Sequence, residues 1–146
     1  MSSSAVIQSL LGKWKDSSAD AENLEAYLKA IGMPDEAVKA ACQSEATTEW
    51  TVDGDAVTYS FESSFKPGSV RSITFQLGQP FEENTITGRS LQTTYTEEGG
   101  KLVKRQIGEP FNCTITTEIV EPGLIVETMV CDSNPPTSCK RKLRKQ

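Results

Sequence analysis

Short runs of alternating apolar and polar residues, separated by turn residues, fill the chain after about residue 45 and most constrain its fold. Trp50 and Val52 alternate with polar neighbours before Asp53-Gly54, a pair typical of hairpin turns. Similar runs follow at residues 57–61, 73–77, 91–95, 115–120 and 124–130, and turn residues recur about every 8 to 12 positions. Because successive side chains of a strand point to opposite faces, this pattern predicts an antiparallel sandwich or barrel.

One earlier stretch, residues 23–31, has helical periodicity. Its apolar residues, spaced by three and four, are Leu24, Tyr27, Leu28 and Ile31. Asp20 is the expected N-cap, and Gly32 stands where a glycine commonly ends a helix. A second helix is predicted from residue 33 to about 44, because Pro34 suits a first turn and two acidic residues follow it. The result is a helix-turn-helix, and its acidic helix starts argue against DNA binding.

The composition excludes most common kinds of catalytic site. The chain of 146 residues contains no histidine, which excludes a Ser-His-Asp triad, a Cys-His pair and histidine-containing metal sites. It also has no glycine-rich phosphate loop and no recognisable pair of acids, so we expect no enzyme, no cofactor and no metal.

The net charge and the length of the apolar runs limit the classes of partner that are expected. The 20 acidic and 15 basic residues give a net charge of -5, which argues against a nucleic-acid partner. No apolar run approaches the ~20 residues of a membrane span, so we expect a soluble protein.

The four cysteines, Cys42, Cys113, Cys131 and Cys139, include no C-x-x-C pair. An even number allows two disulfides, as in a secreted domain. The N-terminus has neither a basic segment nor a long apolar segment, so it does not resemble a signal peptide. We therefore expect a cytoplasmic protein with four free thiols rather than disulfides.

The predicted strands are unusually polar. Threonine occurs 15 times, mostly within strands, and Ser60, Gln76, Gln92 and Gln106 add to this polarity. A barrel whose interior holds water and a ligand accommodates such residues. Threonine is also a good strand former with its hydroxyl in solvent, and composition alone leaves both interpretations open.

Short motifs occur in a fixed order from Gly12 almost to the C-terminus. They are GKWK (12–15), YLKAIG (27–32), VDGD (52–55), SSFK (63–66), FQLGQPFEE (75–83), GGKLV (99–103) and LIVE (124–127). Each motif is weak by itself, but the ordered set resembles the intracellular lipid-binding proteins, the fatty-acid-binding protein family.

The resemblance implies a mainly β fold of lipocalin-like (calycin) architecture. It would be a ten-stranded antiparallel β-clam or barrel with a helix-turn-helix lid, one domain over residues 1–146 with residues 1–10 as an N-terminal extension. Such proteins enclose a water-filled cavity, which favours the cavity interpretation of the polar strands. The implied function is that of a cytoplasmic, monomeric carrier of long-chain fatty acids or similar amphiphiles.

The resemblance also assigns ligand anchors. The family holds a carboxylate with an Arg-x-Tyr pair in the last strand and an arginine two strands earlier. Arg141 falls on the first arginine, Leu143 replaces the tyrosine, and Thr117 stands where the second arginine lies. We expect Arg141 to be the principal anchor, because a buried carboxylate needs charge-assisted partners. With two anchors replaced, the alternative is a bulkier ligand (a retinoid, bile acid or other amphiphile) whose head group lies near the portal.

Five further positions are candidate ligand contacts. Phe65 matches the family's portal phenylalanine, with ordinary core packing as its alternative. Leu24 and Tyr27 are expected to face the cavity from the first helix, although such spacing also suits a core. Arg89 matches a cavity arginine, with a surface ion pair as the alternative, and Gln106 aligns with a cavity glutamine.

The role of the basic tail stays open at this stage. The basic tail at 140–145 suits a solvated strand edge, a nuclear-import-like patch, or a contact with anionic membranes during ligand transfer. An extracellular lipocalin would need a signal peptide, eight strands and no early helical hairpin, so the carrier interpretation is preferred.

Overall fold

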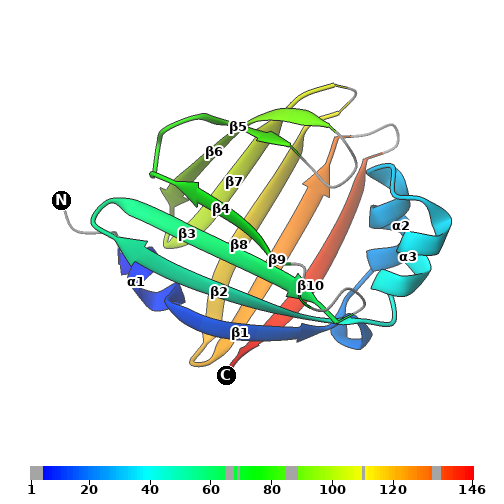
Figure 1. The fold of residues 1–146 in the computed structure, drawn as a ribbon, viewed down its shortest axis with the longest axis horizontal. Coiled ribbons are helices and arrows are strands. Elements are labelled where there is room, and N and C mark those ends of the chain that lie inside the picture. The colour runs from blue at the N-terminus through cyan, green and yellow to red at the C-terminus, as the bar shows by residue number, and fades with distance from the viewer. Residues whose placement is uncertain (1–4, 65–67, 69, 85–88, 110, 133–135) are drawn as a thin grey trace.

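The computed structural model describes residues 5–64, 68, 70–84, 89–109, 111–132 and 136–146. Ten antiparallel strands form one sheet in the order β4-β3-β2-β1-β10-β9-β8-β7-β6-β5. Their bounds are β1 Gly12–Ser17, β2 Glu45–Asp53, β3 Ala56–Ser63, β4 Arg71–Phe75, β5 Phe81–Asn84, β6 Ser90–Glu98, β7 Lys101–Ile107, β8 Cys113–Glu121, β9 Leu124–Cys131 and β10 Thr137–Lys145. The sheet curves round into a nearly closed barrel, as Figure 1 shows. The expected ten-stranded fold is therefore confirmed.

Strands β4 and β5 are the two edges of this sheet. No ladder of backbone hydrogen bonds joins them within the residues that the structure describes. A side-chain hydrogen bond links the two edges: Arg71 Nη2 on β4 donates to the Asn84 carbonyl oxygen on β5 at 3.1 Å. The barrel is therefore open along this seam.

Two helices lie together at one end of the barrel, α2 (Leu24–Ala30) and α3 (Asp35–Ala41) (Figure 1). They form the expected helix-turn-helix, and Gly32 between them has φ +92°, a conformation that glycine adopts without strain. The expected N-cap is wrong: Asn23 occupies the N-cap position of α2, without a side-chain capping bond. Asp20 lies in the 3-10 helix η1 (Ser18–Asp20) and pairs with Arg144 at 2.8 Å.

A third helix, α1 (Ala5–Leu10), lies at the opposite end of the barrel (Figure 1). The sequence analysis found only one helical region, so this helix corrects it. Ile7 and Leu10 are buried with Trp14, and Trp14 Nε1 donates to the Leu10 carbonyl oxygen at 2.8 Å. A helix this short offers too few apolar repeats for a periodic pattern to be seen.

The cysteines correct a second expectation. Cys113 and Cys131 form a disulfide, while Cys42 and Cys139 remain thiols. The two bonded cysteines stand directly opposite each other on β8 and β9, with their Cα atoms 4.2 Å apart. Their separation of 18 residues along the chain did not reveal this register.

The core has two parts. One cluster, around Trp14, Trp50, Phe75, Tyr95 and Leu143, packs with α1 and fills that end of the barrel. The second cluster lies under the lid, the name used here for α2 and α3 together. Its α2 residue Tyr27 packs against Cys113, Met129, Cys131 and Cys139. None of the helices described is both long enough and apolar enough to cross a membrane.

Candidate functional site

A cavity of about 300 Å³ lies between α2 and the strands, at the lower end of the range for ligand sites. Most of its wall is apolar. The apolar and aromatic side chains are Leu24, Tyr27, Leu28, Ile31, Met33, Tyr59, Phe61, Ile73, Leu91, Cys113, Ile115 and Met129. The charged residues on the same wall are Arg71, Glu83, Arg89, Lys104 and Arg141. Such a wall suits a hydrocarbon chain that carries a small polar group.

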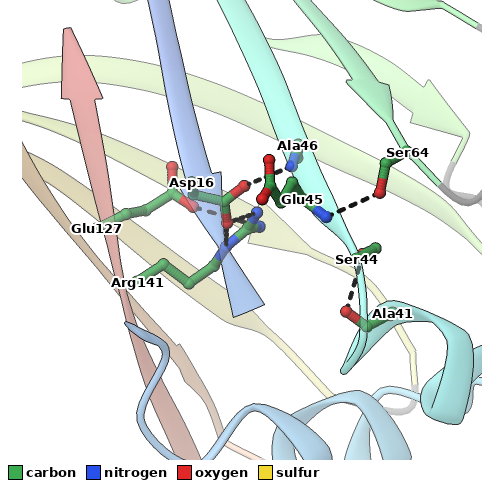
Figure 2. Close-up of polar contacts among 8 residues, drawn as sticks. All are labelled: Asp16, Ala41, Ser44, Glu45, Ala46, Ser64, Glu127 and Arg141. Carbon is green, nitrogen blue, oxygen red and sulfur yellow. Dashed lines mark hydrogen bonds and ion pairs between the residues drawn. The ribbon is translucent and has the colours of Figure 1, made fainter. Parts of the chain in front are cut away.

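Arg141 on β10 points into the barrel, and its side chain is only 20% exposed. Its Nε donates to Asp16 Oδ2 at 2.8 Å, and its Nη2 donates to the same oxygen. Its Nη1 lies 4.0 Å from Glu127 Oε1 on β9. Figure 2 shows the two carboxylates converging on the one guanidinium. The predicted anchor Arg141 therefore lies on the cavity wall, but Asp16 already accepts hydrogen bonds from two nitrogens of its guanidinium.

Asp16 was missed by the sequence analysis. It lies on β1, its side chain is 4% exposed, and its Oδ1 accepts the Ala46 backbone N–H at 3.0 Å. A signal was present, because Trp14 and Asp16 are two positions apart and therefore share one face of the strand. An inward tryptophan implies an inward aspartate, and a buried aspartate implies a cationic partner.

Glu127 is the second carboxylate of this group, and its side chain is 14% exposed. The strand register places it directly opposite Arg141 on one side and Thr117 on the other. Burial raises the pKa of the Glu127 carboxyl above its ordinary value, and the charge of Arg141 offsets only part of this rise. As the pH falls, Glu127 therefore takes up a proton at a higher pH than a glutamate with an ordinary pKa does.

A second polar group lies on β5, β6 and β7. Glu83 accepts hydrogen bonds from Thr93 Oγ1 at 2.8 Å, Gln106 Nε2 at 2.9 Å and Lys104 Nζ at 3.1 Å. Burial by itself raises the pKa of Glu83, but the Lys104 charge and these hydrogen bonds together lower it below its ordinary value. Glu83 is therefore a fully satisfied carboxylate on the cavity wall.

The other predicted contacts divide into two groups. Leu24, Tyr27, Gln106 and Arg89 line the cavity together with Arg141. The guanidinium of Arg89 also lies 3.9 Å from the ring centre of Phe111 and donates to three backbone carbonyls of the β7–β8 connection.

Two predicted residues do not line this cavity, and a third is outside the described part of the chain. Leu143 is buried in the Trp14 cluster. Thr117 is buried on β8 beside Glu127. Phe65 lies outside the residues that the structure describes.

Comparison with known proteins identifies the family. Residues 9–141 match the model of the lipocalin / cytosolic fatty-acid binding protein family. Fatty acid-binding protein 12 of Mus musculus is 33% identical over 125 residues, which cover 86% of this chain and 91% of that protein. A fatty acid-binding protein of Tyrophagus putrescentiae is 36% identical over 122 residues, covering 83% of this chain and 88% of that protein.

Solved structures agree with this assignment. A Schistosoma mansoni fatty acid binding protein in complex with arachidonic acid superposes with a TM-score of 0.84 and 25% identity, covering 97% of this chain and 99% of that one. The apo form of Caenorhabditis elegans lipid binding protein 8 gives a TM-score of 0.83 and 31% identity, covering 100% and 99%. The chain therefore belongs to the lipocalin / cytosolic fatty-acid binding protein family, a family of non-enzymatic lipid-binding proteins.

Proposed function

We propose that this chain is a monomeric cytosolic carrier that reversibly binds a long-chain lipid, a fatty acid or similar amphiphile, in the cavity under α2. The observation that carries the proposal is the apolar cavity wall beneath a helical lid. The arachidonic acid bound by the Schistosoma mansoni relative supports a ligand with a long hydrocarbon chain.

The hydrocarbon chain supplies the affinity. Burial of a methylene group contributes about 0.8 kcal/mol, so a chain of about sixteen carbons gains on the order of 10 kcal/mol before ordering costs. After those costs, a dissociation constant of about 1 μM or lower is expected.

The polar end of the ligand has two candidate positions. Arg141 lies on the cavity wall and carries a positive charge, which supports a carboxylate there. The contacts of Arg141 with Asp16 and Glu127 support the alternative, because a ligand carboxylate would be the third acid around one guanidinium. Of the two, the geometry favours a head group that makes no salt bridge to Arg141.

Displacement of a fluorescent fatty acid from delipidated protein tests the carrier function. Ile115→Trp, which fills the cavity from β8, should weaken binding at least about tenfold. Thr116→Trp places the same bulk on the opposite face of β8 and serves as the matched control. The ligand should be recovered chemically unchanged. Failure of every long-chain lipid to displace the dye, or equal effects of the two variants, would overturn the proposal.

A further inference from the structure

A second, smaller cavity of about 150 Å³ adjoins the main one beneath the lid. Asp16, Ala46 and Ser63 stand opposite one another on β1, β2 and β3, so their side chains share the inner face of the sheet. All three line this cavity, and Ala46 contributes only a methyl group between the two polar residues. Leu28, Phe61 and Arg141 are among the residues that line both cavities, so the smaller one is a recess of the larger one. Most of its wall is apolar, and its polar side chains include Asp16, Ser63 and Arg141.

The charges in this recess disfavour an anion. One guanidinium, on Arg141, faces the two carboxylates of Asp16 and Glu127 (Figure 2). Asp16 Oδ2 accepts from both Nε and Nη2 of the Arg141 guanidinium, two of the N–H groups that a ligand carboxylate would use. A fatty-acid anion would have to displace Asp16 and leave that buried carboxylate without its partner.

The hydrogen bonds in the recess favour a hydroxyl. Ser63 is 6% exposed, and its Oγ has no hydrogen-bond partner within the part of the chain that the structure describes. Such a buried hydroxyl is unfavourable until it finds a partner. Asp16 Oδ1 accepts one backbone N–H and has a lone pair to spare. A ligand hydroxyl can donate to Asp16 and accept from Ser63 without adding charge.

We propose that Asp16 selects the head group of the ligand: it holds Arg141 away from carboxylates and, with Ser63, forms a subsite for an uncharged lipid alcohol. The hydrocarbon chain of that alcohol extends into the apolar cavity. This inference rests on the proposed carrier function and adds the substrate class to it.

Competition between two ligands with the same chain tests this proposal. Oleyl alcohol and oleate each displace an uncharged fluorescent dye from delipidated protein at pH 7.5. The wild type should bind the alcohol at least about tenfold more tightly than oleate. Asp16→Asn keeps the size of the side chain and removes its charge, and it should raise the affinity for oleate about tenfold.

Two further variants separate the parts of the subsite. Ser63→Ala should weaken oleyl alcohol severalfold and leave oleate unchanged, because only the alcohol uses that hydroxyl. Glu45→Gln is the control for charge, since Glu45 lies next to Ala46 on β2 but is exposed on the outer face. It should change neither affinity. Ser63→Ala and the wild-type preference still test the proposal if Asp16→Asn does not fold.

The outcomes separate the two proposals. Oleate binding as tightly as oleyl alcohol to the wild type, or an Asp16→Asn variant with unchanged oleate affinity, would overturn the selector and leave the carrier in place. Displacement by neither lipid would overturn the selector, and failure of every other long-chain lipid as well would overturn the carrier too.

Discussion

Removal of the Arg141 charge is expected to destabilise the fold before it reports on any ligand. In Arg141→Gln, the carboxylates of Asp16 and Glu127, 4% and 14% exposed, lose the cation between them. Breaking a buried ion pair by removing one partner costs about 3–5 kcal/mol. Because the Arg141 side chain is 20% exposed, the lower end of about 3 kcal/mol applies. That is a large part of the 5–15 kcal/mol by which a typical domain is stable.

Urea unfolding of delipidated protein at pH 7 measures this loss. With a denaturant slope of about 2 kcal/mol per molar, the midpoint should fall by about 1.5 M. Arg144→Gln is the matched control, because Arg144 and its partner Asp20 are 55% and 45% exposed and their pair should contribute less than about 1 kcal/mol. In an Asp16→Asn background, Arg141→Gln should cost clearly less than in the wild type.

The pH dependence provides an independent check. Burial already raises the pKa of Glu127 in the folded protein, and loss of Arg141 removes the main charge that opposes this rise. A carboxyl with a raised folded pKa binds more protons in the native state, so stability falls as the pH rises through that pKa. The deficit of Arg141→Gln should therefore shrink in mild acid.

A loss below about 1 kcal/mol, or one equal to that of Arg144→Gln, would refute the buried ion pair. If the loss is confirmed, weaker ligand binding by Arg141→Gln does not by itself identify a carboxylate anchor.

Three other predictions follow from the side-chain contacts. Lys104→Met should lower the free energy of unfolding by about 2 kcal/mol, because Glu83 then keeps only its uncharged donors. Since the pKa of Glu83 is lowered in the folded protein, the stability that Glu83 contributes is present above about pH 4.5 and is lost as the pH falls through the folded pKa. Acid unfolding of the wild type measures this loss. Reduction of Cys113–Cys131 should cost about 3 kcal/mol in urea unfolding, and thiol titration of the unfolded, unreduced protein should count two thiols rather than four. Burial raises the pKa of the Cys139 thiol to about 11, so alkylation at pH 8 should be slow in the folded protein and fast in urea.

Local signals in the sequence predicted the antiparallel strands and the helix-turn-helix, while the number of strands came from the family resemblance. Alternation around Trp50, Tyr59 and Tyr95 predicted strands, and glycines at turns such as Gly54, with φ +62°, marked their ends. These features depend on sterics and side-chain periodicity within a few residues, so they can be recognised from the local sequence alone. The ordered motifs then pointed to the family, which the comparisons confirm.

The polar contacts of the cavity depended on the tertiary structure. Arg141 was a candidate from its position in the last strand, but its partner Asp16 lies 125 residues away. Their contact exists because β1 and β10 become neighbours when the sheet curves, and the register then sets the two side chains diagonally across the ladder. The Cys113–Cys131 bond has the same origin in the β8–β9 register. The sequence by itself thus determined the strands and the lid, whereas only strand pairing, a long-range property, decided which charges face each other inside the barrel.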